Sequence, residues 1–216
     1  MFPVSDVIPS RTRPVVTIGL IVLNALVFLH QLTLGQRALQ IFVATYALIP
    51  AAFLAPALIT SQFLHGGWMH VIWNMVYLWI FGDNIEDRLG HVRYLVFYLG
   101  AGVVAALLQL VFNPTSGVPM LGASGAIAGV MGAYFVLYPQ SRVLTVIFIV
   151  FYVDVVEIPA LFFLGIWFLM QVLNGLGSLG LRSDSGGTAF WAHVGGFAAG
   201  ACVGAVLRAR DRRWQS

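Results

Sequence analysis

The sequence predicts an all-α membrane protein: a bundle of six transmembrane helices with a membrane-embedded loop between the first two. Composition is the first reason, because 60% of the 216 residues are apolar, 9% are charged and the mean hydropathy is +0.91. A soluble domain carries charge on about a quarter of its residues. Length is the second reason, because the chain can hold about six helices of ~20 residues each. We therefore expect one compact membrane domain.

Six apolar segments are the expected spans. They are Val15–Leu34, Trp68–Gly82, Tyr94–Phe112, Ser124–Tyr138, Pro159–Leu176 and Ala189–Leu207. The first is too long for the core of a signal peptide and lacks a small-residue cleavage site, so we expect it to be retained. The membrane domain would then cover residues 15–207, with an N-terminal cytoplasmic tail of residues 1–14 and a basic cytoplasmic tail of residues 208–216.

Two further apolar segments are not assigned as spans. Gly35–Gly67 is broken by two prolines, and we expect it to lie in the interface or to enter the membrane partway, since lipid-exposed backbone must stay internally hydrogen-bonded. Val143–Val156 is rich in β-branched and aromatic residues and is either a seventh span or a loop at the membrane face. The loop is favoured, because Asp154 and Glu157 would be costly at depth.

The arginines give the bundle an orientation. With six spans and both termini in the cytoplasm, all arginines except Arg37 and Arg182 fall on the cytoplasmic side, as the positive-inside rule requires. A seventh span at Val143–Val156 would move the four C-terminal arginines to the outside. A starting methionine, no transit peptide and a bare six-span core indicate a bacterial plasma membrane.

Glycines recur at helical spacing in two of the expected spans. They are Gly122, Gly125, Gly129 and Gly132 at the fourth span, and Gly196, Gly200 and Gly204 in the sixth. Helices in lipid associate through small residues that allow close backbone approach. The pattern therefore predicts that the fourth and sixth spans pack together.

Polar side chains inside a membrane are candidates for function. They are Asn24, His30, His65, His70, Asn74, Gln109, Ser124, Gln171, Asn174 and His193. In the expected topology the second, fourth and sixth spans all begin at the outer face, which places Ser124, His193 and His70 at one shallow depth. Asn74 shares a helix face with His70 at i and i+4. These four residues are predicted to converge.

The converging residue types suit acyl transfer. A serine hydroxyl becomes a nucleophile when a base such as histidine takes its proton. Asparagine, histidine and backbone N–H groups can stabilise the resulting oxyanion, and Ser124 at a helix start has free N–H groups beside it. No acidic residue lies at this depth, since Asp184 is expected in a solvated loop. The residues therefore favour a Ser124–His193 dyad over a triad.

Four motifs in this order resemble the rhomboid family of intramembrane serine proteases. They are His65-Gly-Gly-Trp-Met-His70-Val-Ile-Trp-Asn74, Glu86-Asp-Arg-Leu-Gly90, Gly122-Ala-Ser124-Gly125 and Ala192-His193-Val-Gly195-Gly196. With the six-span plan, the resemblance covers about Gln62 to Leu207. It implies a bundle of rhomboid type that hydrolyses peptide bonds in or near transmembrane segments of other membrane proteins.

The resemblance also implies roles for individual residues. Ser124 would be the nucleophile and His193 the general base, while His70 and Asn74, with backbone near Ser124, would bind the oxyanion. The fifth span would be a gate for transmembrane protein substrates, which reach the site among membrane lipids. No cofactor, metal or nucleic acid is implied, and the oligomeric state is left open.

Two departures from the family pattern stand out. The Trp-Arg pair that some members carry in the first loop is absent. Some members have a tyrosine one helical turn after the serine, beneath the histidine ring, where this chain has Ala128. The support of His193, rather than its identity, is therefore the feature that the resemblance does not supply.

Two other functions remain as alternatives. A catalytically silent relative would bind transmembrane clients, but loss of the serine or the histidine would have favoured it, and both are present. A small transporter or channel would use His70, Asn74 and His193 as a proton or solute path, but no acidic residue lies at mid-depth and no inverted repeat is visible.

Other protease chemistries fit less well. There is no His-Glu-x-x-His zinc motif. Asp83 and Asp154 lie near the cytoplasmic ends of different segments, so they do not form an aspartyl pair. The Gly-Ala-Ser-Gly run is not a Gly-x-Ser-x-Gly nucleophile elbow, because Ala126 fills the last position.

Overall fold

Helices dominate the computed structural model, which describes residues 2–149, 152–178 and 189–215. The helices are α1 (Val15–Thr33), α2 (Gln36–Tyr46), α3 (Ala57–Thr60), α4 (Trp68–Leu89), α5 (His91–Phe112), α6 (Ser124–Leu137), α7 (Ala160–Ser178) and α8 (Phe190–Gln215). By length and composition α1, α5, α7 and α8 can each cross a membrane, and α6 is a shorter apolar helix. The expected six spans fit these five helices together with α4, whose polar side chains lower its hydropathy.

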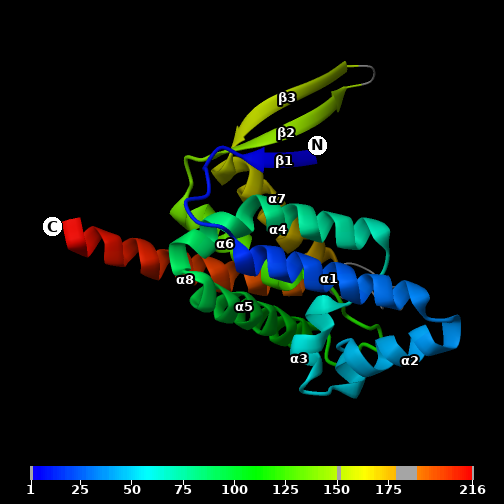
Figure 1. The fold of residues 1–216 in the computed structure, drawn as a ribbon. Coiled ribbons are helices and arrows are strands. Elements are labelled where there is room, and N and C mark those ends of the chain that lie inside the picture. The colour runs from blue at the N-terminus through cyan, green and yellow to red at the C-terminus, as the bar shows by residue number, and fades with distance from the viewer. Residues whose placement is uncertain (1, 150–151, 179–188, 216) are drawn as a thin grey trace.

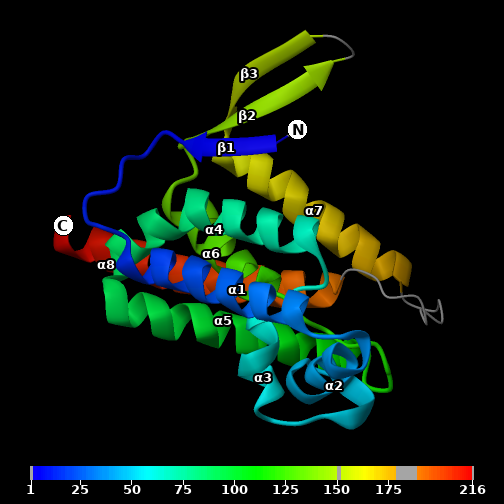
Figure 2. The same cartoon turned by 45° about the vertical axis from the view of Figure 1, so that its right-hand side comes forward.

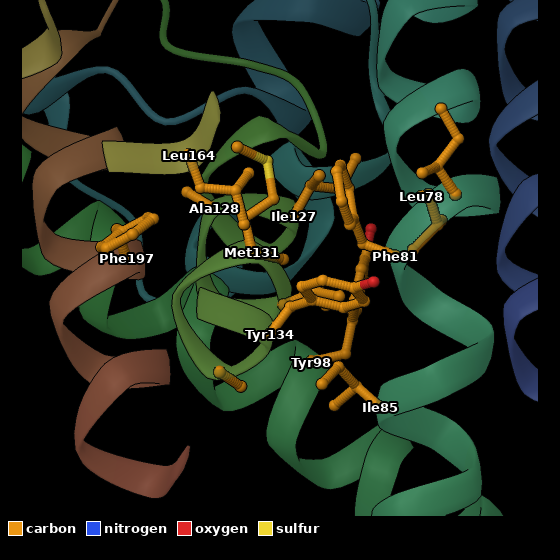
Figure 3. Close-up of a cluster of buried hydrophobic side chains, with 14 of the residues drawn as sticks. Leu78, Phe81, Ile85, Tyr98, Ile127, Ala128, Met131, Tyr134, Leu164 and Phe197 are labelled. Carbon is orange, nitrogen blue, oxygen red and sulfur yellow. The ribbon is translucent and has the colours of Figure 1, made fainter. Parts of the chain in front are cut away.

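Helix α6 lies at the centre of the bundle. It contacts α4, α5, α7 and α8, and its residues from Gly125 to Tyr134 are all buried (Figure 1). Figure 3 shows Met131 and Tyr134 of α6 packed beside Phe81 of α4, in the main cluster of buried apolar side chains. A helix that is apolar on every side belongs in the interior of a bundle. Ser124 is thereby the first residue of a helix that is packed on all sides.

The contact between α6 and α8 is close enough to exclude a methyl group. A Cβ atom added to Gly196 would lie 2.0 Å from the carbonyl oxygen of Gly125. One added to Gly200 would lie 1.7 Å from that of Gly129. The prediction that the fourth and sixth spans pack through their glycines is confirmed.

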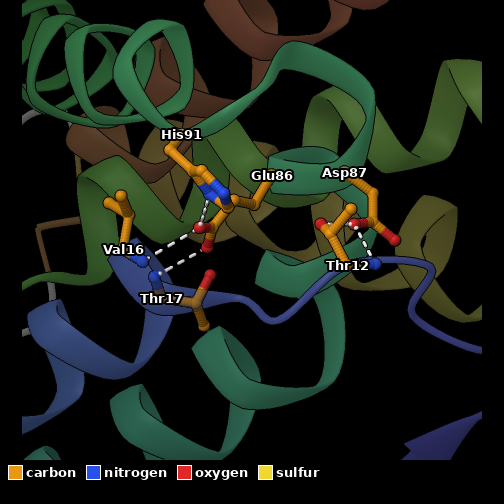
Figure 4. A network of polar contacts seen from close by, with 6 residues as sticks. All are labelled: Thr12, Val16, Thr17, Glu86, Asp87 and His91. Atoms are coloured by element: carbon orange, nitrogen blue, oxygen red, sulfur yellow. Dashed lines mark hydrogen bonds and ion pairs between the residues drawn. The ribbon is translucent and has the colours of Figure 1, made fainter.

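A buried carboxylate holds the start of α1 against the end of α4. The two oxygens of Glu86 accept the N–H groups of Val16 at 2.9 Å and Thr17 at 2.8 Å, and one of them lies 2.6 Å from His91 Nδ1 (Figure 4). The first N–H groups of a helix have no partner within the helix, and a carboxylate satisfies them with favourable dipole interaction. The Glu86 side chain is fully buried, so it replaces water as the cap of α1.

The residues that follow Glu86 complete this junction. Asp87 accepts the N–H group and the hydroxyl of Thr12, in the segment that leads into α1 (Figure 4). Gly90 ends α4 at φ +77, a left-handed conformation that favours glycine, and α5 begins at the next residue. The Glu86–Gly90 motif is therefore a structural corner that joins three helices.

An antiparallel sheet of three strands stands beside α4 and α7 (Figure 1). Its strands are β1 (Phe2–Asp6), β2 (Arg142–Ile149) and β3 (Tyr152–Pro159), in the order β1-β2-β3. Arg142 pairs with Pro159, and Phe2 pairs with Val146. The described residues of Val143–Val156 form no seventh helix, as expected, and the favoured loop has the form of two paired strands. Its β-branched residues suit a hairpin.

The base of the sheet is attached to α6 by a polar cluster. The Tyr134 hydroxyl donates to the Asp6 carboxylate and lies 2.7 Å from Ser141 Oγ. Burial, reinforced by the Asp83 carboxylate, raises the pKa of the Asp6 carboxyl to about 6, against the lowering effect of the Tyr134 hydrogen bond. The expected N-terminal tail thus contains a strand with a fixed attachment to the bundle.

The segment between α1 and α4 has regular structure. It holds α2, α3 and two short 3₁₀ turns, Pro50–Ala52 and Ser61–Phe63, which gather at one end of the bundle in Figure 2. The Gln31 side chain on α1 exchanges two hydrogen bonds of 3.0 Å with the backbone of His65. This amide fixes the chain just before α4 begins, which is where His70 and Asn74 follow.

At the opposite end, α8 continues without a break to Gln215. Asp211 forms an ion pair with Arg88, and Arg208 donates to the backbone carbonyl of Val136 at 3.1 Å. The residues expected as a C-terminal tail therefore extend the last helix. The physical reason is that Asp211 and Arg208 find partners on α4 and α6.

Candidate active site

All four residues predicted to converge line one cavity of about 960 Å³. Ser124 is the first residue of α6, His193 is the fourth residue of α8, and His70 and Asn74 lie in the first two turns of α4. Each comes from the same end of its helix. The structure thus brings together, at one end of the bundle, residues that are far apart in the sequence. His70 and His193, for example, are 123 positions apart.

Ser124 and His193 are hydrogen-bonded directly. Ser124 Oγ lies 2.8 Å from His193 Nε2, within the usual range for such a pair. His193 is only 9% exposed. Gly125 directly follows Ser124 and Gly196 lies three residues after His193, so the close α6–α8 contact adjoins both side chains.

Gly122 brings backbone against the His70 ring. It adopts φ +122, and an added Cβ would lie 2.6 Å from His70 Nε2, so only glycine fits. The N–H group of Gly66 donates a hydrogen bond of 3.4 Å to His70 Nδ1. Because Nδ1 accepts this hydrogen bond, the proton of a neutral His70 belongs on Nε2. His70 therefore presents an N–H donor toward the chain that precedes Ser124.

Asn74 adds a second donor on the same side. Its Nδ2 atom is buried and has no hydrogen-bond partner in the described part of the chain. A Cβ atom added to Gly122 would lie 3.6 Å from this Nδ2 atom. A buried donor without a partner is uncommon and calls for an explanation. The N–H groups of the first turn of α6, beginning at Ser124, are also free of intrahelical partners. The His70 and Asn74 side chains line the same cavity as Ser124.

Gln171 on α7, for which the sequence predicts no role, contacts His193. Its Oε1 atom lies 2.8 Å from His193 Nδ1, on the side of the ring opposite Ser124. Its Nε2 atom donates to the carbonyl of Trp167, one turn earlier, at 3.4 Å. The only signal in the sequence is a glutamine in an apolar span, which does not show what it faces.

Ala128 occupies the place where some family members have tyrosine. It is fully buried, and its Cβ would lie 3.3 Å from a Cβ on Gly196. Ala128 therefore lies against the α6–α8 contact. The Trp167 ring of α7 lies beside His193 instead, with centroids 5.6 Å apart.

Three other polar candidates, Asn24, His30 and Asn174, do not line this cavity. Asn24 donates to the carbonyl of Leu20 at 2.8 Å, His30 is exposed, and Asn174 faces outward on α7. Asp184 lies outside the described residues. In the part of the chain that the structure describes, no group of three His, Cys, Asp or Glu side chains could hold a metal ion.

Fold and site together define a multi-pass helical membrane protein with a serine–histidine pair inside its bundle. The family model of the Rhomboid domain matches residues 55–210. The chain therefore belongs to the rhomboid family. The motifs around His70, Ser124 and His193 all fall within the matched region.

Three relatives illustrate the range of the family. The chain is 30% identical over 210 residues to Rhomboid protein 1, mitochondrial, of Saccharomyces cerevisiae, covering 92% of this chain and 56% of that protein. It is 35% identical over 135 residues to the mouse (Mus musculus) Presenilin-associated rhomboid-like protein, mitochondrial, covering 61% of this chain and 35% of the relative. It is 38% identical over 85 residues to Rhomboid protease GluP of Bacillus subtilis, covering 39% of this chain and 16% of that protein. The chain thus spans about half, or less, of these relatives.

Proposed function

We propose that the protein is a serine endopeptidase that hydrolyses peptide bonds in or near the transmembrane segments of other membrane proteins. The observation that carries this proposal is the 2.8 Å contact between Ser124 Oγ and His193 Nε2 inside a helical membrane bundle. A serine and a histidine at this distance have the geometry of a nucleophile with its base. The name of the Bacillus subtilis relative includes the word protease, which agrees with this activity.

The reaction would proceed by acyl transfer. His193 Nε2 takes the proton of the Ser124 hydroxyl as Oγ attacks the carbonyl carbon of the scissile bond. The tetrahedral intermediate collapses, His193 gives its proton to the leaving amine, and the N-terminal part of the substrate stays as an ester on Oγ. A water molecule then attacks the ester while His193 takes its proton. His193 returns that proton to Oγ, which releases the carboxyl product.

The oxyanion of each intermediate would be stabilised by the donors beside Ser124. His70 Nε2 and Asn74 Nδ2 both lie close to Gly122, two residues before Ser124, and the first N–H groups of α6 have no partner within the helix. Donors that are already fixed in a site of low dielectric need no reorganisation when charge develops. The absence of a protein partner for Asn74 Nδ2 among the described residues agrees with a donor reserved for the reaction.

A substrate helix must unwind before it can react. Its backbone carbonyls are hydrogen-bonded within the helix, so Ser124 can attack only an extended segment, which helix-breaking residues would supply.

The relatives include two mitochondrial proteins and a bacterial one, so the comparisons do not single out the expected bacterial plasma membrane. The cytoplasmic placement of both termini stays a prediction, to be tested with topology reporters.

The test is cleavage of a panel of transmembrane substrates in detergent by the wild type and by Ser124→Ala, with products identified by mass spectrometry. We expect cleavage by the wild type and none by the variant. A matched Ser5→Ala variant, at an exposed serine of β1, should cleave like the wild type. Equal cleavage by Ser124→Ala and the wild type would refute the proposal.

Covalent labelling separates a protease from a silent client-binding relative. A fluorophosphonate probe should label the wild type at Ser124, and His193→Ala should abolish labelling because the hydroxyl then keeps its proton. An unlabelled wild type that still binds transmembrane clients would favour the binding function. Solute flux in liposomes without cleavage would favour a transporter.

A further inference from the structure

We infer that Gln171 is a positioning residue that fixes the tautomer and the ring orientation of His193. The inference rests on the proposed function, because His193 needs a particular tautomer only if it acts as a base. The observation is the 2.8 Å contact from Gln171 Oε1 to His193 Nδ1, opposite the 2.8 Å contact from His193 Nε2 to Ser124 Oγ. The site would thus have three members, each from a different helix.

The orientation of the Gln171 amide follows from its second contact. Its Nε2 group donates to the Trp167 carbonyl oxygen, which is an acceptor only. Turning the amide over would place two oxygens against each other and lose this hydrogen bond. Gln171 therefore faces His193 with its oxygen, and an oxygen of this kind can only accept.

The tautomer of His193 follows in turn. Since Gln171 Oε1 accepts, His193 Nδ1 must carry the proton of the neutral ring. The other nitrogen, Nε2, is then left with its lone pair directed at Ser124. This is the form that a general base requires. The opposite tautomer would place a proton between Nε2 and the serine hydroxyl and leave the base inactive.

Burial gives this contact its importance. Gln171 and His193 are each only 9% exposed, so water is largely kept from Nδ1. A protonated ring nitrogen without an acceptor in this environment would be an unsatisfied buried donor. No carboxylate in the described residues is hydrogen-bonded to His193, and the neighbouring ionisable group on another helix is His70. Gln171 thus fills the orienting position that an aspartate holds in a triad.

The same helix also replaces the missing tyrosine. Ala128 leaves no aromatic ring from α6 beneath His193, whereas Trp167, one turn before Gln171 on α7, lies beside the imidazole. Residues at i and i+4 share a helix face. Helix α7 therefore supports His193 with a ring contact and a hydrogen bond together.

Two substitutions at Gln171 separate positioning from packing. Gln171→Leu removes the acceptor at similar size and should lower kcat about ten- to a hundredfold with KM nearly unchanged. Gln171→Glu keeps an oxygen acceptor at the same place and should restore kcat to within about tenfold of the wild type. The control Asn174→Leu, on the exposed side of the same helix, should leave both constants unchanged. If Gln171→Leu keeps kcat within twofold, or if Glu impairs kcat more than Leu does, the inference is wrong.

A spectroscopic readout keeps this test independent of proteolysis. Nitrogen NMR of ¹⁵N-histidine-labelled protein in micelles, with His193 assigned by its loss in His193→Asn, should show the Nδ1–H tautomer in the wild type. Gln171→Leu should reduce that tautomer or broaden its signal. A wild type that does not cleave any substrate would overturn the proposed function, while the tautomer would still test Gln171. An unchanged His193 signal in Gln171→Leu would overturn the inference alone.

Discussion

Adding one methyl group at Gly200 should inactivate the protein without touching any residue of the site. The Cβ atom of Gly200→Ala would lie 1.7 Å from the carbonyl oxygen of Gly129, where real Cβ atoms essentially never come closer than 3.0 Å. The oxygen belongs to the backbone of a buried helix and cannot turn aside. Helices α6 and α8 must therefore separate or rotate by the difference, at least 1.3 Å.

The expected loss of activity follows from the residues that these two helices carry. Ser124 is on α6 and His193 on α8, and their 2.8 Å contact has only 0.7 Å to spare before it passes 3.5 Å. A displacement of about 1 Å at a reacting pair can cost on the order of 10²-fold in rate. Overpacking also costs roughly 1–3 kcal/mol of stability. We expect kcat to fall about a hundredfold and the thermal midpoint to fall with it.

Gly100→Ala is the matched control. Gly100 is an exposed residue of α5, and an added Cβ meets nothing within 4 Å. Alanine is favoured over glycine in a helix by roughly 1 kcal/mol, so this variant should be as stable as the wild type or slightly more so. Cleavage kinetics, fluorophosphonate labelling of Ser124 and thermal unfolding in one detergent compare the two. If Gly200→Ala matched Gly100→Ala in all three, the close α6–α8 contact would not determine the site geometry.

Three further predictions concern other groups. Glu86→Ala should destabilise the protein by about 3–5 kcal/mol, because buried N–H groups at the start of α1 lose their acceptor. Asp87→Ala, at a partly exposed carboxylate whose donors can turn to water, should cost only about 1 kcal/mol. Denaturant unfolding in micelles measures both. Asn74→Ala should lower kcat about 10²- to 10³-fold with little change in KM, and a loss confined to KM would assign Asn74 to substrate binding instead. The attachment of β1 should weaken as pH rises through about 6, because the folded-state pKa of Asp6 lies above its ordinary value of 3.8 and protonation favours the docked strand. The contribution is fully present below about pH 4, and Asp6→Asn should flatten the change in thermal midpoint between pH 5 and 7.5; an equal slope in both proteins would contradict this.

The hairpin shows where local sequence reasoning stops. The β-branched run of Val143–Val156 and its two acidic residues argue against a span, but they do not choose between a loop and paired strands. The pairing of β1 with β2 joins Phe2 to Val146 across most of the chain. No local pattern in the first six residues predicts that they pair with β2. Such long-range pairing depends on where α4, α6 and α7 place the two segments.

Sequence alone predicted the membrane class, six spans that the helices of the structure fit, and four polar residues that line one cavity. These follow from hydropathy and from the cost of polar side chains in lipid, which are local properties that each residue carries with it. The glycine spacing also sufficed to pair the fourth span with the sixth, because close helix approach in lipid requires small residues.

The way His193 is held follows from the packing of the helices and not from a local pattern. Ala128 indicated that the usual support was missing, yet a glutamine in an apolar helix does not reveal which neighbour it faces. That depends on the rotation of α7 against α8, which packing sets and the sequence pattern does not. The 2.8 Å contact from Gln171 to His193 is therefore a property of the assembled bundle.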